Sequence, residues 1–371
     1  MKKRLVGLTA VAASALLLAA CGSSGGSSSS SPSATSTAAS GQVQVGVILP
    51  DTASSTRWEQ KDRPYLTKAF AAAGIKADVQ NAQGNPAQFQ TLCEGFISAG
   101  VKVLLVTTLE SGGPACIKKA KAQGIKVIDY DRLTLGGGAD YYVSFDNVAV
   151  GKAIGTGLVK CLTDAGKKTA SVVELNGSPT DNNATLFKQG YDKVIRDAGY
   201  TVLASQAVPK WDNTQAGTIF EQIFTKYGSK IQGVASANDG LGGAVASVLA
   251  RNGLTGKVPV TGQDATDEGL GRVLTGAQCV TVYKSVKNEA AKAAAIAVAL
   301  AKGDTAGASA LATATVADTT LNTKVASVLL TPVGIYKDTV KSVVDDGFTT
   351  ATALCGQSSA VATACTKAGI K

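Results

Sequence analysis

Short apolar segments alternate with longer amphipathic segments along most of this chain, and the alternation runs twice. Apolar segments such as 101–107 and 231–237 have the length of buried strands. Segments between them, such as 86–99 and 214–227, have the periodicity of helices. Strands that alternate with helices form parallel sheets with right-handed crossovers. The pattern predicts an α/β protein, and its restart after Asn147 predicts two halves of one architecture.

The expected elements follow this alternation from residue 43 to residue 330. In the first half we expect strands at 43–49, 76–82, 101–107, 125–130 and 141–145, and helices at 62–73, 86–99 and 114–123. In the second half we expect strands at 170–175, 201–206, 231–237, 258–261 and 279–284, and helices at 148–163, 185–199, 214–227, 240–252, 266–274 and 286–301. The stretch 305–318 has low complexity, a last strand is expected at 325–330, and no elements are predicted in the tail.

The N-terminal segment carries an export signal. Three cations at residues 2–4 precede an apolar run at 5–20, which is short for a membrane span. The run ends in Leu-Ala-Ala-Cys-Gly at 18–22, which resembles the lipobox of bacterial lipoproteins. We expect residues 1–20 to be a signal peptide, Cys21 to be lipidated and 21–41, rich in Ser, Gly, Ala and Thr, to be a flexible tether. The alternative, an ordinary secretory signal, also predicts export.

Charge and composition exclude several classes of function. The formal net charge is +9, and removal of the three signal-peptide cations leaves 9 − 3 = +6. The lysines are scattered, which indicates a solvated surface and no nucleic-acid binding. The chain has no histidine, so the usual general base and the commonest metal ligand are absent. Catalytic triads and zinc sites are disfavoured, whereas catalysis by Asp, Lys or Cys stays open at this point. Our prediction is a protein with no metal, no cofactor and no enzymatic activity.

Six cysteines remain besides Cys21, an even number that suggests disulfides in an exported protein. Cys355 and Cys365 are close in sequence, and Cys93 and Cys116 fall on successive predicted helices. Those two pairs would leave Cys161 with Cys279. Six cysteines allow fifteen connectivities, so other pairings stay open at this point.

Polar side chains follow the predicted strands where each strand ends. The loop after 170–175 is the densest case, because Asp181, Asn182 and Asn183 place one carboxylate beside two amides. Open α/β sheets bind ligands at the carboxyl ends of their strands. Carboxylates and guanidinium groups form strong hydrogen bonds with hydroxyls, and tryptophan rings suit the C–H faces of a pyranose. The residues at these strand ends are Arg57, Trp58, Asp129, Tyr130, Asp131, Arg132, the loop 177–184, Trp211, Asp212, Asn238, Asp239, Gln263, Asp264 and Lys284.

These candidates also have structural interpretations. An isolated tryptophan more often lies in a core than against a ligand, and Asp131 with Arg132 could form a surface ion pair of little energetic consequence. Lys284 could be solvated. Their shared position at one edge of both halves favours recognition of a small molecule in a cleft. We expect Asn182 to cap the next helix, and the other residues that could be caps are Asp181, Asp239 and Asp264.

Several runs of these residues are together very similar to xylose-binding proteins, the sugar-capturing subunits of bacterial ABC importers. The resemblance covers roughly residues 43–303, in order. The chain departs from Gram-negative members in its lipid anchor, its extra cysteines and segment 49–56. The similar runs are Arg57 to Arg63, Tyr130 to Arg132, Gly177 to Ala184, Ala237 to Asp239, Gly262 to Ala265 and Val282 to Lys284.

The resemblance implies a type I periplasmic-binding-protein fold, with two doubly wound α/β domains joined by three crossing strands. The crossings would fall near Asn147, Tyr283 and Leu330. The domains would comprise 42–147 plus 284–325, and 148–283 plus 326–371 with the tail. The resemblance implies that Trp58 and Trp211 sandwich a sugar ring. Its hydroxyls and ring oxygen would be bound by Arg57, Asp131, Arg132, Asp181, Asn183, Asn238, Asp264 and Lys284. These ten are the candidate binding residues.

The implied function is capture of a monosaccharide, D-xylose or a related aldopentose, by hinge closure. A monomer anchored by lipid to the outer face of a Gram-positive cell membrane would deliver the sugar to ABC permease subunits. One alternative is a sensing subunit that presents the sugar to a membrane receptor or kinase. A more distant alternative is an exported sugar-processing enzyme that uses Asp131 and Asp264 as its carboxylate pair.

Overall fold

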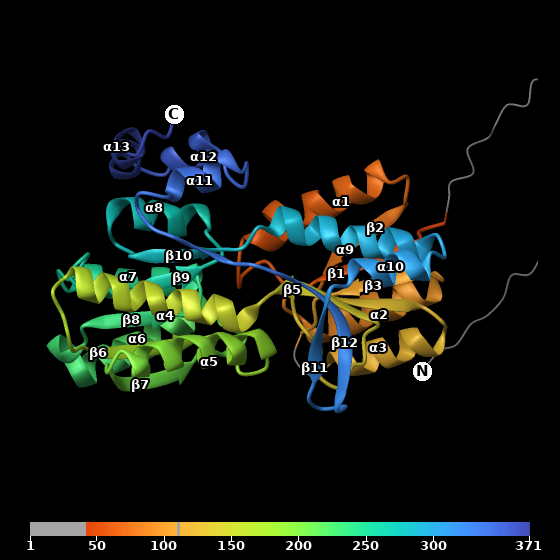
Figure 1. Cartoon of the computed structure of the whole chain (residues 1–371), viewed down its shortest axis with the longest axis horizontal. Helices are drawn as coiled ribbons and strands as arrows, with labels where there is room; N and C mark the ends of the chain where they lie inside the picture. The colour runs from red at the N-terminus through yellow and green to blue at the C-terminus, as the bar shows by residue number, and fades with distance from the viewer. Residues whose placement is uncertain (1–41, 110–111) are drawn as a thin grey trace, which may run out of the picture. The chain divides into compact units, whose positions relative to one another are not determined.

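One seven-stranded sheet and two linked three-stranded sheets form the framework of the described chain (Figure 1). The computed structural model describes residues 42–109 and 112–371, which belong to one compact unit. The predicted signal peptide, the lipidation site Cys21 and the tether to residue 41 lie outside the described residues.

The first sheet has the strand order β11-β12-β5-β4-β3-β1-β2. All neighbouring strands are parallel except β11, which runs antiparallel to β12. The sheet therefore takes in a late hairpin as well as the strands of the first half. The strands are β1 (Val45–Leu49), β2 (Ala77–Asn81), β3 (Val103–Val106), β4 (Lys126–Tyr130), β5 (Tyr141–Phe145), β11 (Ala314–Asp318) and β12 (Thr323–Leu330).

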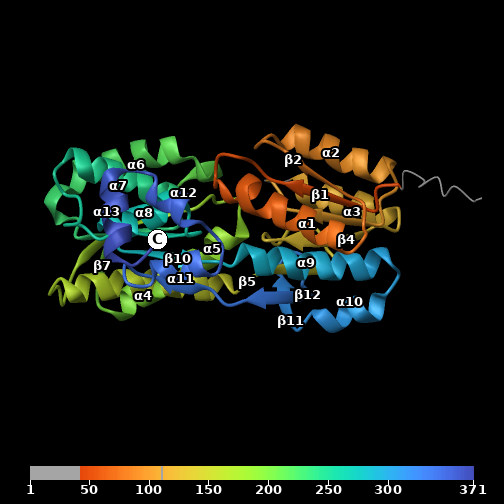
Figure 2. The same ribbon diagram turned by 90° about the horizontal axis from the view of Figure 1, so that it is seen from above.

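Both faces of this sheet are buried, because successive side chains of a strand point to opposite faces. In β3, Val103 and Leu105 pack in one hydrophobic cluster while Leu104 and Val106 pack in another. Figure 2 shows α1 and α9 side by side. The first cluster includes residues of η1 (Trp58–Asp62), α1 (Arg63–Ala72) and α9 (Val286–Ala301), and the second includes residues of α2 (Pro86–Ser98) and α3 (Gly113–Ala122).

The second half repeats this topology. Two three-stranded sheets, β7-β6-β8 and β13-β10-β9, are linked by a parallel bridge between Val234 and Val260. The combined order β7-β6-β8-β9-β10 matches β2-β1-β3-β4-β5 of the first sheet, which is the flavodoxin-like doubly wound arrangement. The strands are β6 (Ser171–Asn176), β7 (Thr201–Ala207), β8 (Gly233–Ser236), β9 (Thr261–Gln263), β10 (Val280–Tyr283) and β13 (Val333–Ile335).

The helices of the second half include one very close pair, α4 and α5. A Cβ atom on Gly190 of α5 would lie 2.4 Å from the carbonyl oxygen of Val148 in α4, so only glycine permits this approach. The helical segments are α4 (Asn147–Asp164), α5 (Asn182–Asp197), η3 (Pro209–Trp211), α6 (Asn213–Tyr227), η4 (Gly228–Lys230), α7 (Asp239–Arg251) and α8 (Asp267–Thr275).

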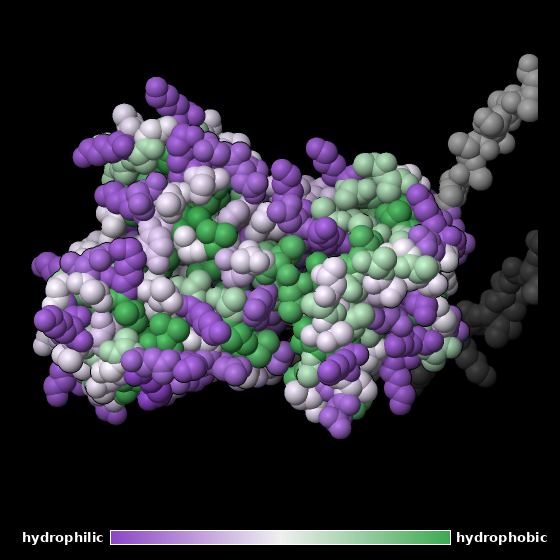
Figure 3. Space-filling model, viewed as in Figure 1, coloured by the Kyte–Doolittle hydropathy of each residue, from purple (hydrophilic) through white to green (hydrophobic). Residues whose placement is uncertain are grey.

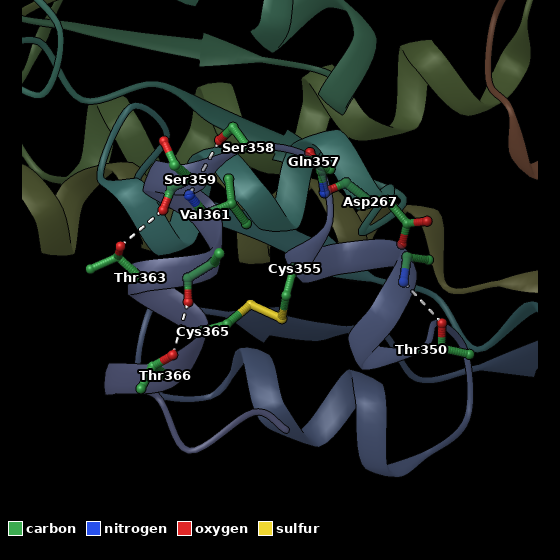
Figure 4. Close-up of a disulfide and its surroundings, with 12 residues drawn as sticks. Asp267, Thr350, Cys355, Gln357, Ser358, Ser359, Val361, Thr363, Cys365 and Thr366 are labelled. Carbon is green, nitrogen blue, oxygen red and sulfur yellow. Dashed lines mark hydrogen bonds between the residues drawn. A yellow bond between two sulfur atoms is a disulfide. The ribbon is translucent and has the colours of Figure 1, made fainter.

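The C-terminal tail forms three short helices that pack against α8. They are α11 (Val340–Asp345), α12 (Ala351–Cys355) and α13 (Ser359–Lys367). Figure 4 shows the disulfide between Cys355 and Cys365, which joins α12 to α13. Between these helices, Gln357 Nε2 donates to the carbonyl oxygen of Asp267 at the start of α8. The tail is thus fixed to the second half by apolar packing and a hydrogen bond.

The structure contains all three predicted cysteine pairs, Cys93–Cys116, Cys161–Cys279 and Cys355–Cys365. Several element predictions were wrong. The low-complexity stretch contains α10 (Thr305–Leu311) and β11, and the tail is helical. The expected strand at 258–261 is only a bridge at Val260, followed by β9. The helix expected from residue 62 begins at Arg63 as α1, directly after η1. The expected domain boundary between residues 325 and 326 falls inside β12, which pairs with β5 in the first sheet as far as Leu330.

The surface is mixed in character. Figure 3 shows hydrophilic residues spread over the visible face with hydrophobic residues between them. Across residues 42–109 and 112–371, the structure contains no helix that is both long enough and apolar enough to span a membrane.

Candidate functional site

The ten candidate residues line a single cavity. Asp131 follows β4, Asp264 follows β9 and Lys284 follows β10, so loops at the carboxyl ends of strands from both halves meet there. The space between the lining atoms, with the solvent at its mouth included, is about 320 Å³, of which about 20 Å³ admits a water-sized molecule in this conformation. The sequence had not singled out four further lining residues as binding residues. The complete lining is Ser54, Ser55, Arg57, Trp58, Asp131, Arg132, Asp181, Asn183, Phe187, Trp211, Asn238, Gln263, Asp264 and Lys284.

Arg57 is the centre of a buried ionic cluster. Its Nη1 lies 2.8 Å from Asp131 Oδ2, and its Nη2 lies 2.7 Å from Glu289 Oε2. Nε and Nη2 also donate to both oxygens of Asp62, at 2.9 and 2.8 Å. Burial alone would lower the pKa of the Arg57 guanidinium, but Asp62, Asp131 and Glu289 raise it well above its usual range. Arg57 therefore stays charged and is already held by three carboxylates.

Sequence reasoning missed Asp62 and Glu289 as partners of the site. Both side chains are fully buried, in η1 and α9. Burial raises the pKa of both carboxyl groups, more than the nearby Arg57 lowers it. The available signal was weak: Asp62 lay within a run similar to xylose-binding proteins, and Glu289 is the only acidic residue of an alanine-rich helix.

Asp131 receives contacts from both halves. Lys284 Nζ lies 3.5 Å from its Oδ2, and Asn183 Nδ2 donates to its backbone oxygen at 2.8 Å. Burial opposes ionisation, but Lys284, Arg57 and Arg132 outweigh it and hold the pKa of Asp131 below its usual range. The same Lys284 Nζ lies 3.3 Å from Asp264 Oδ1. Burial lowers the pKa of Lys284, but Asp131 and then Asp264 raise it above its usual range. Asp131 and Lys284 are consequently both charged at neutral pH.

The two tryptophans are buried at the cavity and held by their N–H groups. Trp58 Nε1 donates to Ser54 Oγ at 3.2 Å, and the Arg57 guanidinium lies 4.4 Å from the centre of the Trp58 ring. Trp211 Nε1 donates to Asp181 Oδ2 at 3.1 Å. Gly177 permits this position, because a Cβ atom there would lie 2.1 Å from the Trp211 ring. These contacts fix two large apolar faces at the site.

The helix caps differ from those expected. Asp181 caps α5, with Oδ1 accepting from the Asn183 N–H at 2.9 Å, so the prediction that Asn182 is the cap was wrong. Asp181 Oδ2 lies 3.0 Å from Arg132 Nε as well as accepting from Trp211, so the carboxylate both caps the helix and lines the cavity. Its two oxygens serve these two purposes separately.

Asn238 caps α7 by accepting from Leu241 N–H, while its Nδ2 donates to the Ser54 backbone oxygen at 3.3 Å. The cap alternative fails for Asp239, whose buried carboxylate accepts from Gln278 and Thr281. It also fails for Asp264, because Thr266 caps α8. Asp264 is thus left to face Lys284 and the cavity.

The binding loops hold unfavourable backbone conformations. Five non-glycine residues in them have positive φ angles, a region that residues other than glycine rarely occupy. Such strain persists only where the surrounding structure enforces it, and it gathers at functional sites. The residues are Asp131 (64°), Lys210 (57°), Trp211 (56°), Asp264 (95°) and Ala265 (49°).

The cavity lining has equal numbers of cationic and anionic side chains, and two of its buried oxygen atoms accept no hydrogen bond. Arg57, Arg132 and Lys284 supply three cations, and Asp131, Asp181 and Asp264 supply three anions. Two buried lining atoms, Gln263 Oε1 and Asp264 Oδ1, accept no hydrogen bond. Within the described parts of the chain, no group of three or more Cys, Asp or Glu side chains is placed to hold a metal ion. The arrangement suits a small uncharged ligand with several hydroxyl donors.

Comparisons with known proteins show the family of the chain. Residues 45–305 match the family described as Periplasmic binding protein domain. The chain is 36% identical to the D-xylose-binding periplasmic protein of Escherichia coli (strain K12) over 324 residues, which covers 85% of this chain and 93% of the relative. It is 31% identical to the multiple sugar-binding periplasmic receptor ChvE of Rhizobium radiobacter, over 83% of this chain and 91% of that protein.

A solved structure shares the fold. The ABC transporter solute binding protein from Clostridium phytofermentans with bound β-D-glucose superposes with a TM-score of 0.75 at 27% identity, over 84% of this chain and 99% of that chain. All three proteins are named for binding rather than for catalysis, in agreement with the prediction that this chain is not an enzyme. The chain belongs to the periplasmic binding protein family, and within that family it is similar to the D-xylose-binding proteins.

Proposed function

We propose that this chain is an exported solute-binding protein that captures a monosaccharide, D-xylose or a related aldopentose. The observation that carries the proposal is the composition of the cavity. It has three cations and three anions, two buried oxygen acceptors that receive no hydrogen bond, and two tryptophan rings at one site. A neutral sugar ring can donate hydroxyls to those acceptors and can lay its C–H faces against the indoles.

The choice of xylose rests on similarity. The D-xylose-binding relative is 36% identical, whereas a structure that holds β-D-glucose is 27% identical. Changes around one hydroxyl of the ligand can switch such a preference. The ten candidate residues are proposed as the ligand contacts, with Trp58 and Trp211 on the two faces of the ring.

The proposed mechanism is closure of two domains around the sugar. Hydrogen bonds already link the two halves at the cavity, from Asn238 to Ser54 and from Asn183 to Asp131. A ligand that touches both halves favours the closed state, because only that state completes its contacts. We propose that a monomer, anchored through Cys21 to the outer face of the cell membrane, then delivers the sugar to an ABC permease.

A sensing role is the second candidate, since one sugar-binding relative is named a receptor. The same cavity would serve both roles. Uptake of labelled sugar separates the two roles. Deletion of the gene should abolish uptake if the protein delivers sugar to an importer, and should leave uptake unchanged if the protein acts only as a sensor.

Isothermal titration calorimetry with D-xylose, L-arabinose, D-ribose, D-glucose and D-galactose tests the binding proposal. We expect one sugar per chain and tightest binding of xylose. Tighter binding of another aldose would overturn the choice of xylose, and no binding of any aldose would overturn the function itself.

A further inference from the structure

A second and larger pocket lies directly beside the cavity. The space between its lining atoms, its open mouth included, is about 1330 Å³, against 320 Å³ for the cavity. We call it the outer pocket, and its own lining includes Thr52, Gln83, Leu109, Leu133, Thr180 and Asn182. The two spaces share Ser54, Arg132, Asp181 and Trp211. Only one layer of side chains therefore separates them.

The partition is a short chain of polar contacts. Asp181 Oδ2 accepts from Trp211 Nε1 at 3.1 Å and lies 3.0 Å from Arg132 Nε. Asp181 is also fixed as the cap of α5 through the Asn183 N–H. Besides that ion pair, the contacts of Arg132 are longer: its Nη1 donates to the Thr108 backbone oxygen at 3.4 Å, and its guanidinium lies 5.5 Å from the centre of the Trp58 ring. Its side chain is 11% exposed. The guanidinium of Arg132 is thus the part of the partition that can move aside.

The outer pocket offers neutral hydrogen-bonding groups beside an apolar strip. Gln83 and Asn182 supply amides, Thr52 and Thr180 supply hydroxyls, and Leu109 adds apolar surface. Two carboxylates of the lining are already engaged within their own loops. Asp51 accepts from Ser54 N–H and Oγ–H, and Asp212 accepts from the backbone N–H groups of Thr214 and Gln215. This mixture suits a second polyhydroxylated unit, and the cations Arg132 and Lys210 also line the outer pocket.

The loops of the outer pocket are also strained. Gln83 has φ 55° and Lys210 has φ 57°, and both residues line the outer pocket without lining the cavity. Conformations of this kind need support from the surrounding structure and gather at functional sites. The outer pocket therefore has the preformed character of a binding site.

We propose that the outer pocket is a second sugar subsite, so that the protein binds a short oligosaccharide with its terminal unit in the cavity. The inference rests on the proposed function of the cavity. The glycosidic bond would pass between the two spaces where Arg132 meets Asp181. Trp211 and the α5 cap hold Asp181 in place while the Arg132 guanidinium is displaced.

Calorimetry of the full-length protein with D-xylose, methyl β-D-xyloside and xylobiose tests this subsite. The variant Thr180→Trp fills the outer pocket from an exposed position that does not line the cavity, and Thr52→Trp does so from the other half. Thr225→Trp, on the exposed side of α6, is the matched control. If the aldose that binds is glucose, cellobiose and methyl β-D-glucoside replace the xylosides.

We expect the wild-type protein and Thr225→Trp to bind both sugar and disaccharide. Each pocket variant should weaken disaccharide binding at least tenfold and change monosaccharide binding less than twofold. Binding of xylose without xylobiose overturns the subsite and leaves the proposed function standing, as does an equal effect of the variants on both ligands. Absence of binding to every aldose overturns the proposed function instead.

Discussion

Asp131 shows how single residues organise the cavity. Its carboxylate lies within ion-pair distance of Arg57 and Lys284, and its backbone oxygen accepts from Asn183, Tyr142 and Ser144. These contacts hold the backbone at a φ of 64°. The sequence predicted Asp131 from its place after a strand, but it did not predict that cations would already surround the carboxylate.

Trp211→Ala should weaken binding of the preferred sugar by about tenfold or more, because it removes one proposed ring face. The substitution should also lower the free energy of unfolding by about 3 kcal/mol, since the ring is 6% exposed and packs near Phe187. Calorimetry on protein shown by circular dichroism to be folded checks the first effect.

Trp211→Phe is the matched control, since it keeps an aromatic face and loses only the N–H bond to Asp181. It should bind the sugar more tightly than Trp211→Ala does. Equal affinity of wild type and Trp211→Ala would remove Trp211 from the sugar contacts.

Asp129 should make the folded state less stable as pH rises. Burial raises its pKa to about 7, against bonds from Thr134 that lower it. The unfolded carboxyl has a pKa of about 3.9. The folded state thus binds the proton more tightly, and the stability this group contributes below about pH 4 is lost as pH rises to about 7. The loss is of the order of 4 kcal/mol.

Asp129→Asn should remove that pH dependence, because an amide accepts from Thr134 N–H and donates to Thr134 Oγ without ionising. Urea unfolding at pH 4, 5.5 and 7 measures the effect. Asp197→Asn, whose side chain is 63% exposed, should keep the wild-type profile. A profile for Asp129→Asn that parallels the wild type would contradict the assignment.

At the scale of elements, the cluster around Arg57 joins η1, α9 and the loop after β4. Removal of the one guanidinium leaves buried carboxylates without their counter-charge. Arg57→Met should therefore lower the free energy of unfolding by about 3–5 kcal/mol.

Glu289→Gln is the milder companion to Arg57→Met. Burial raises the pKa of Glu289, and its Oε1 has no hydrogen-bond partner, so a neutral amide of the same shape should cost about 1 kcal/mol or less. Urea denaturation compares the two variants. Equal losses would show that the packing of α9, rather than the charge on Arg57, holds these elements together.

The tail disulfide should stabilise its own helices and leave the cavity unaffected. Cys355 and Cys365 close a short loop, for which chain entropy predicts about 3 kcal/mol. Cys355→Ser with Cys365→Ser should lower the melting temperature and keep sugar affinity within about twofold of wild type. A large loss of affinity would instead couple the tail to the binding loops.

The elements also show where sequence patterns stop being informative. Strands such as β3 were predictable because apolar runs of that length are typical of strands buried on both faces. In contrast, α10 buries only Ala308 and β11 buries only Asp318, so neither has a buried apolar face that a hydrophobic period would reveal. The tail helices are short and depend on packing against α8 and on the disulfide.

At the scale of the whole described chain, the repeated strand order explains why the candidate site was predictable. Two sheets with the same topology place their ligand loops at equivalent edges, so residues far apart in sequence converge. All ten candidates line the cavity for this reason. Asp62 and Glu289 escaped prediction because they reach the site through Arg57, from helices whose burial the sequence pattern does not specify.

A crystal structure of the protein grown with D-xylose is the sharpest test of the proposed sugar site. We expect one pyranose in the cavity, with its faces against Trp58 and Trp211 and its hydroxyls bonded to Asp264 and Gln263. A sugar bound outside this cavity, or a cavity that stays free of sugar at saturating xylose, would contradict it.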